Sequence, residues 1–201
     1  GLGFDRAYIY DGAGDEIYDA ESSQVTLLYD STGTFGPVIA AKGFDETSIY
    51  AVNGGNDVAT LHGSDGNDKF TARDIYGRMR GDDGAYIHYA EGFDLVTGDA
   101  SGTTGTDTAI LFDGPGDDYL QAGETSTSLQ FDSSSGGNPN LVASGFDQTY
   151  GYAIRGGDDT ALMTGSANND RFTSKQTYST LKRQDGGYFN YAAGWDQVTG
   201  D

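Results

Sequence analysis

Apolar and polar residues alternate along short segments of this chain, and glycine with Asn-Asp or Gly-Asp pairs bounds each segment. The clearest segment, residues 54–70, reads GGNDVATLHGSDGNDKF, and its aspartates Asp57 and Asp68 lie eleven residues apart. Alternation with a period of two is typical of a β-strand, and glycine and Asn-Asp pairs favour tight bends. No window shows the sustained spacing of three and four that a helix requires. We therefore predict an all-β protein of short strands.

The same unit of bend, strand and bend occurs four times. The spacing of eleven residues recurs in three further acidic pairs, Asp107 and Asp118, Asp159 and Asp170, and, in a degenerate copy at the start, Asp5 and Glu16. Four copies of one unit indicate a repeat protein.

The chain also repeats on a larger scale. Residues 1–99 align with residues 103–201 at a constant offset of 102 and without a gap, which leaves residues 100–102 as a junction. Each period divides into unequal halves of about 50 residues, marked by a Gly-aromatic-Asp triplet. The four triplets are Gly43-Phe44-Asp45, Gly92-Phe93-Asp94, Gly145-Phe146-Asp147 and Gly194-Trp195-Asp196.

Gapless repetition of short strands and bends predicts one continuous parallel β-solenoid, or β-helix, wound from stacked coils. Its narrow interior should hold Ala59, Ala109 and Ala161. Equivalent aromatic residues should form a ladder along its axis, from Phe44 through Phe93 and Phe146 to Trp195. The alternative is two tandem β-sandwich domains of about 100 residues each, joined at residues 100–102. A sandwich needs no sub-repeat near 50 residues, so we favour the solenoid.

The composition narrows the range of partners. The chain has 31 acidic and 11 basic residues, a formal net charge of −20 and no cysteine. Such a surface repels nucleic acid and anionic lipid, and attracts cations. No apolar run approaches the roughly 20 residues that span a bilayer. The chain opens at Gly1 without a signal peptide, so we interpret it as a processed protein or a section of a longer one.

The acidic bends are candidate calcium sites. Calcium binds six to eight hard oxygens, which carboxylates and the carbonyl groups of glycine-rich loops supply. The expected ligands are the acids at the bends, namely Asp5, Glu16, Asp57, Asp68, Asp107, Asp118, Asp159 and Asp170. The alternatives are that these acids form Asx-turns, or that they belong to an acidic coat that confers solubility.

Two resemblances bear on this prediction. Residues 63–70, reading GSDGNDKF, resemble the nonapeptide GGxGxDxUx of RTX (haemolysin-type) calcium-binding repeats, as do residues 165–172 and, more loosely, 102–109. The resemblance implies Asp68, Asp170 and Asp107 as calcium ligands. Nearly the whole chain is similar to the repeats of about 50 residues in giant surface proteins of planctomycete-type bacteria, with their GFD, GND and Tyr-rich segments. That similarity implies a secreted structural or adhesive role at the bacterial cell surface.

The sequence offers little for enzyme chemistry. Neither histidine is repeated, because His62 and His88 align with Thr164 and Asn190. The nucleophile, zinc and phosphate-loop motifs are absent. We therefore predict a non-enzymatic extracellular protein whose partners are copies of itself, stacked head to tail, or neighbouring repeats of a longer chain. One alternative is an adhesin that binds glycans through loops at residues 30–37 and 132–139, and another is a polysaccharide lyase.

Overall fold

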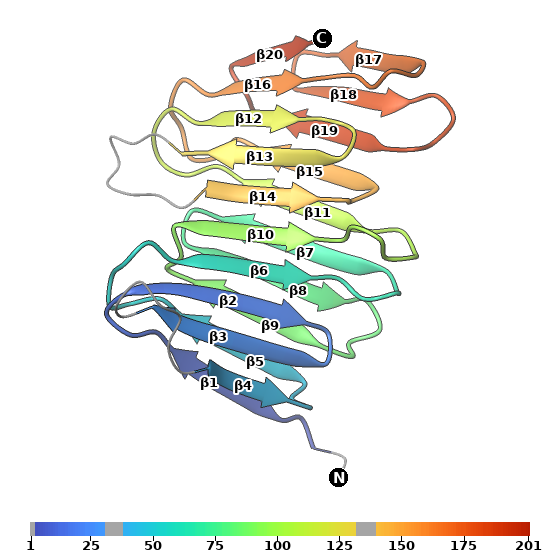
Figure 1. Cartoon of the computed structure of the whole chain (residues 1–201). Coiled ribbons are helices and arrows are strands. Elements are labelled where there is room, and N and C mark those ends of the chain that lie inside the picture. The colour runs from blue at the N-terminus through green and yellow to red at the C-terminus, as the bar shows by residue number, and fades with distance from the viewer. Residues whose placement is uncertain (1–2, 31–37, 132–139) are drawn as a thin grey trace.

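The computed structural model describes residues 3–30, 38–131 and 140–201, and every regular element in these ranges is a β-strand. The prediction of an all-β protein is therefore confirmed. The strands form two ten-stranded sheets. Within each sheet, the strands are arranged side by side from the N-terminal to the C-terminal end of the molecule (Figure 1).

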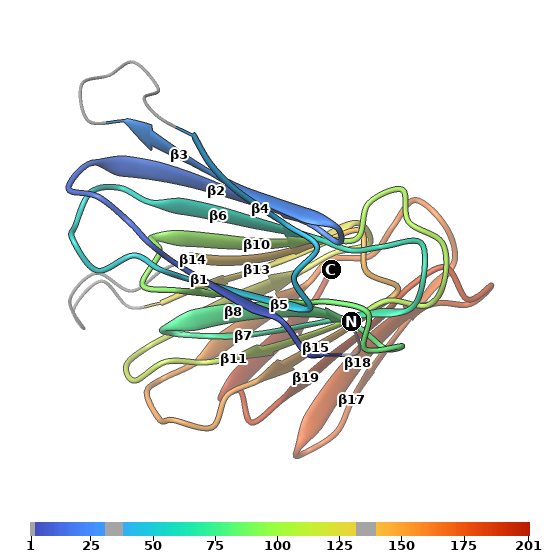
Figure 2. The ribbon, with the colours of Figure 1, turned by 90° about the horizontal axis from the view of Figure 1, so that it is seen from below.

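Sheet I contains, in spatial order, β1 (Arg6–Tyr10), β5 (Glu46–Tyr50), β9 (Ile87–Glu91), β8 (Tyr76–Gly81), β7 (Asp68–Arg73), β11 (Thr108–Phe112), β15 (Gln148–Tyr152), β19 (Phe189–Ala193), β18 (Tyr178–Arg183) and β17 (Asp170–Ser174). Sheet II contains β4 (Val38–Lys42), β3 (Gln24–Asp30), β2 (Asp15–Glu21), β6 (Val58–His62), β10 (Leu95–Asp99), β14 (Asn140–Ser144), β13 (Ser126–Gln130), β12 (Tyr119–Ala122), β16 (Thr160–Met163) and β20 (Gln197–Gly200). Figure 2, seen from below, shows the two sheets as facing layers.

The chain moves back and forth between the two sheets. It contributes either a single strand to a sheet or a meander of three antiparallel strands, such as β2–β3–β4 in sheet II and β7–β8–β9 in sheet I. The first half of a period places one strand in sheet I, a meander in sheet II and one strand in sheet I. The second half repeats this order with the sheets exchanged. The sub-repeat of about 50 residues thus corresponds to an exchange of sheets.

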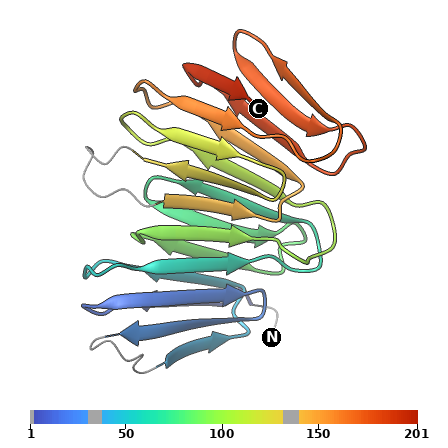
Figure 3. The ribbon, with the colours of Figure 1, turned by 45° about the horizontal axis from the view of Figure 1, so that its top comes forward.

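The sheets are mixed rather than purely parallel. Eight of the ten strands in each sheet run in one direction, and the middle strands of the meanders, β3 and β13 in sheet II and β8 and β18 in sheet I, run against them. The parallel pairs β7–β11 and β10–β14 join the two periods, so each sheet contains strands from both (Figure 3). Two open facing sheets are also the layer arrangement of a β-sandwich.

The core lies between the sheets. Most strands alternate buried residues with partly exposed ones, and the two buried sets meet in one cluster. Ala59, Ala109 and Ala161 are buried, as predicted.

The predicted aromatic ladder needs correction. Phe44 and Phe146 precede strands of sheet I, whereas Phe93 and Trp195 precede strands of sheet II. The exchange of sheets in each half-period separates the two pairs, so the four residues do not form one column. Phe93 instead packs against Tyr18, with ring centroids 6.2 Å apart. Phe93, Phe146 and Trp195 are buried, and they fill the core as separate side chains.

In three of the four triplets, those that begin at Gly92, Gly145 and Gly194, the glycine lies against the backbone of the neighbouring layer. Gly92 and Gly194 both have a φ of 86°, a conformation that favours glycine. A Cβ atom at Gly92 would lie 2.1 Å from the carbonyl oxygen of Ala51, and one at Gly194 would lie 2.0 Å from that of Ala153. Close backbone contact between layers therefore explains why these triplets begin with glycine. None of the described residues belongs to a helix that could cross a membrane.

Candidate metal centre

Aspartates at the starts of the strands bind the backbone of the next layer. The backbone N–H of Glu16 donates to Oδ1 of Asp57 at 2.8 Å, and that of Asp57 donates to Oδ2 of Asp94 at 2.8 Å. The equivalent residues Asp118, Asp159 and Asp196 form the same chain of contacts, at 2.9 Å each. We call these columns the aspartate ladders. They satisfy amides that a tight bend would otherwise leave without partners.

Sheet I has corresponding ladders. The backbone N–H of Asp5 donates to Oδ2 of Asp45 at 2.6 Å, and the backbone N–H of Asp68 donates to Oδ1 of Asp107 at 2.8 Å. The N–H of Asp107 donates in turn to Oδ2 of Asp147 at 2.8 Å. Seven of the eight acids expected as calcium ligands are thus distributed over several ladders at the bends, where they accept or donate hydrogen bonds between layers.

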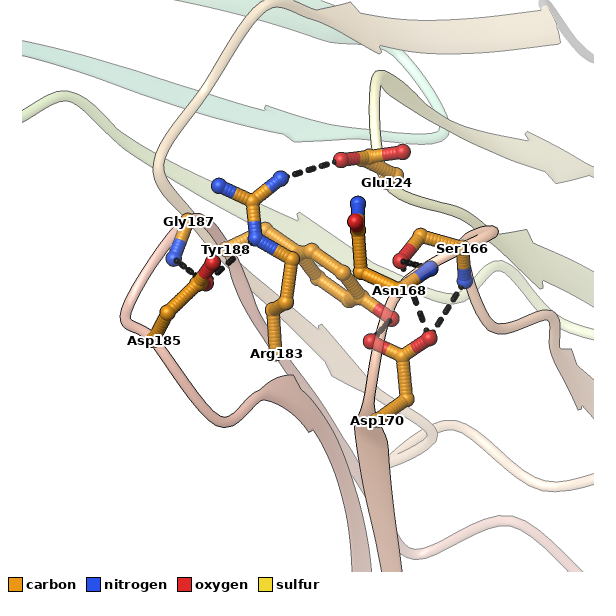
Figure 4. Close-up of polar contacts among 8 residues, drawn as sticks. All are labelled: Glu124, Ser166, Asn168, Asp170, Arg183, Asp185, Gly187 and Tyr188. Carbon is orange, nitrogen blue, oxygen red and sulfur yellow. Dashed lines mark hydrogen bonds and ion pairs between the residues drawn. The ribbon is translucent and has the colours of Figure 1, made fainter.

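Asp170, at the C-terminal end, has both carboxylate oxygens engaged (Figure 4). Its Oδ2 accepts hydrogen bonds from the backbone N–H and Oγ of Ser166 at 2.7 and 3.0 Å, and its Oδ1 accepts one from Tyr188 at 2.8 Å. Burial would raise the pKa of Asp170, but these hydrogen bonds outweigh it and lower the pKa. Nearby, Arg183 pairs with Glu124 at 2.6 Å. Side chains of the protein therefore already stabilise the charge of Asp170.

Three acids of the first period converge on one point. Asp11, Glu16 and Asp57 are buried, and each offers a carboxylate oxygen within 4.8 Å of the others. It is the one group of three or more potential metal ligands among residues 3–30, 38–131 and 140–201. We call it the acidic cluster. Two of its members were predicted as ligands, and Asp11 was not.

The surroundings hold Asp11 firmly in place. Its Oδ2 accepts the backbone N–H groups of Val52 and Asn53, each at 2.9 Å, and its Oδ1 accepts the side-chain amide of Asn53 at 2.8 Å. Glu16 differs, because it is 1% exposed and its Oε2 has no hydrogen-bond partner. A buried carboxylate oxygen without a partner is costly unless a proton or cation neutralises it.

The pKa shifts agree with this geometry. Burial raises the pKa of Glu16 to about 7, and the hydrogen bond and charge of Asp57 and the charge of Asp11 act in the same direction. Burial also raises the pKa of Asp57, against hydrogen bonds from Glu16 that lower it. Three carboxylates held this close repel one another. A bound cation would relieve the repulsion, and hard oxygen ligands of this kind suit calcium.

Sequence reasoning missed Asp11 and the aspartates of the four triplets. Asp11 lies inside the first repeat rather than at a Gly/Asn-Asp bend, although its counterpart Asp113 at the offset of 102 was a usable signal. The triplet aspartates were treated as markers of phase, and the structure shows them accepting backbone amides. Of the loops expected to bind glycans, residues 31–37 and 132–139 lie outside the described part of the chain.

Comparison with known proteins gives no relative, because no protein-family model, no curated protein and no solved structure matches this chain.

Proposed function

We propose that the chain is a non-enzymatic structural unit of a β-solenoid, stabilised by calcium, which stacks end to end with units of its own kind in an extracellular surface fibre. The open edges of the two sheets are the observation that carries this proposal. The location outside the cell rests on the resemblance to surface-protein repeats.

The edge strands at the two ends of the molecule are equivalent to strands that pair with each other at the junction of the two periods. β1 and β4 are edge strands at the N-terminal end, and β17 and β20 are edge strands at the C-terminal end. The counterparts of β1 and β4 at the offset of 102 are β11 and β14, which pair in parallel with β7 and β10. Those two strands are in turn the counterparts of β17 and β20. A second unit can therefore continue both sheets without new geometry.

The internal register predicts which residues would meet across such a junction. Ala109 lies opposite Phe70 in the pair β11–β7, so Phe172 of one unit would lie opposite Ala7 of the next. In sheet II, the pairing of β14 with β10 places Ile39 opposite Val198 by the same shift. It also places Lys42 opposite Asp201, a pair of opposite charges.

Apolar side chains that are buried inside the stack are exposed at its ends. Phe172 is 39% exposed, whereas its internal counterpart Phe70 is 0% exposed. Ile39 is 39% exposed, whereas its internal counterpart Leu141 is 0% exposed. An exposed edge strand with apolar side chains favours pairing with another strand. A head-to-tail contact that does not close on itself produces an open filament. The neighbouring layer would be a second copy or a further repeat of a longer chain.

Assembly of the 201-residue chain tests the proposal. We expect the protein to form end-to-end oligomers and short filaments as its concentration rises, visible by light scattering and negative-stain microscopy. Phe172→Glu places a charge at the junction and should give monomers. Ile75→Glu changes a side chain that is 55% exposed in the turn between β7 and β8, and should assemble as the unchanged protein does. Monodisperse monomers at every concentration, with and without calcium, would contradict stacking.

A further inference from the structure

The acidic cluster and its counterpart in the second period differ in how their charge is balanced. None of the ion pairs among the described residues involves Asp11, Glu16 or Asp57. In the first period, therefore, three buried acids face one another without a protein cation. The unpartnered Oε2 of Glu16 is an independent sign that a group belongs there.

In the second period an arginine stands where the first has an asparagine. Asn53 and Arg155 are counterparts at the offset of 102, and the backbone N–H of each donates to the equivalent aspartate, Asp11 or Asp113. The guanidinium of Arg155 pairs with Asp74 through Nη1 and Oδ2 at 2.5 Å. Its charge also acts on Asp113, where it opposes the effect of burial.

The third acid also differs between the periods. Glu16 is replaced by the shorter Asp118, whose Oδ2 accepts the backbone N–H of Gly114 at 2.9 Å. The second-period carboxylates do not form a group like the acidic cluster among the described residues. Where the first period has Glu16 and Asn53, the second period therefore has the shorter acid Asp118 and the positively charged Arg155.

We propose that Asp11, Glu16 and Asp57 bind one calcium ion, and that Arg155 supplies in the second period the positive charge that the ion supplies in the first. Two oxygens that bind one calcium ion at about 2.4 Å can lie no more than about 4.8 Å apart, and the three carboxylates meet that limit. Calcium fits better than magnesium because irregular coordination with several carboxylates suits the larger ion. This inference rests on the calcium part of the proposed function and does not depend on stacking.

Calcium titration at a concentration where the protein is monomeric tests the site directly. We expect isothermal titration calorimetry to show one ion per chain at this site. At a hundredfold excess of calcium over Kd, the melting temperature should rise by about 5–10 °C relative to a chelator. Glu16→Gln should abolish both effects while the protein still folds, because it removes a buried charge. Asp118→Asn, the matched change in the second period, should retain both.

A second variant tests the role given to arginine. Asn53→Arg brings the second-period cation into the first period, and should raise the melting temperature in chelator and remove most of the calcium response. The proposal is overturned if Glu16→Gln keeps the calcium shift, or if magnesium stabilises the protein more than calcium. It is also overturned if acid alone stabilises the protein and calcium has no effect, because a proton would then occupy the place of the ion.

Discussion

At the scale of single residues, the acids of this chain act mainly on the backbone. Asp57 accepts the amide of Glu16 and donates its own amide to Asp94, so one residue connects three layers. Because each amide in such a ladder receives a charged acceptor, the hydrogen bonds are stronger than neutral ones. This role explains why acids recur at the bends, and the acidic cluster is the one group of the described residues in which three acids converge on one point.

The triplet glycines give the first prediction at this scale. Gly92 has a left-handed φ, and a Cβ there would collide with the carbonyl oxygen of Ala51 in the next layer. Gly43 has a φ of 71° but lies at the N-terminal edge, and a Cβ there would meet no atom within 4 Å. We expect Gly43→Ala to cost about 1 kcal/mol of unfolding free energy and Gly92→Ala at least about 3 kcal/mol. Urea denaturation measures both, and equal costs would contradict the assigned contact.

A buried histidine gives a prediction about acid stability. Nε2 of His88 donates to the carbonyl oxygen of Glu21 at 2.9 Å, and Nδ1 has no partner. Burial lowers the pKa of His88 to about 4. Since the unfolded chain binds the proton near pH 6.5, the neutral buried ring contributes stability at higher pH, and this stability is lost as the pH falls from about 6.5 to about 4. The loss is about 2–3 kcal/mol.

His88→Asn provides the control for this prediction. Asn190 is the counterpart of His88, and its side-chain amide donates to the carbonyl oxygen of Gly123 at 2.8 Å. Asparagine therefore fits the same place without a titrating group. We expect the variant to fold and to lose less stability than the unchanged protein between pH 6.5 and 4. Parallel stability curves for the two proteins would show that His88 does not titrate as a buried group.

At the scale of strands, the aromatic residues of sheet I form stacks on its outer side. Tyr10 stacks on Tyr50 with centroids 5.4 Å apart, and their counterparts Phe112 and Tyr152 stack at 5.5 Å. The guanidinium of Arg73 lies over the Phe112 ring at 4.9 Å. Such cross-strand pairs stabilise a sheet. These contacts give the outward-facing aromatic residues of sheet I a structural role within the sheet.

The meanders show where the sequence was insufficient. Alternation predicted the strands, but the first turn of each meander carries no Asn-Gly or Asp-Gly signal, unlike the turns at Asp83-Gly84 and Asp185-Gly186 that lead into β9 and β19. Arg73 pairs with Tyr76 across the turn Asp74-Ile75, and Glu21 pairs with Gln24 across Ser22-Ser23. Without a turn signal, the direction of the next strand cannot be inferred from the pattern. A parallel course was therefore predicted where the chain reverses twice.

The acidic cluster was predictable only in part, because the sequence does not show which strands pair. Asp57 and Glu16 stand at repeated bends and were visible as potential ligands. Asp11 belongs to the same cluster because strand pairing between β2 and β6 brings the first two layers together. Such convergence depends on register between residues about 40 positions apart. The spacing of acids along the chain does not contain that information.

At the scale of the whole molecule, the half-period exchange makes every layer depend on the next. In each half-period a meander adds three strands to one sheet, and single strands are added to the other sheet. Over a full period of 102 residues, both sheets therefore gain the same number of strands. The end layers lack this support. Phe172 and Phe70 occupy equivalent positions in the two periods. Phe172 is exposed because no layer follows it, whereas Phe70 is buried because a layer does.

Joining two copies in one chain tests this view. A spacer of Ala-Ser-Gly between Asp201 and the next Gly1 reproduces residues 100–102, which connect β10 to β11. In the single chain we expect Phe172→Ala to cost about 1 kcal/mol, because the ring is partly exposed. In the first copy of the tandem chain, β1 of the second copy would cover that ring, and the same substitution should cost about 3–5 kcal/mol, as expected for Phe70→Ala. Urea unfolding of the single chain and the tandem chain, each with and without Phe172→Ala, gives these differences. If Phe172→Ala costs as little in the tandem chain as in the single one, the second copy does not continue the sheets of the first.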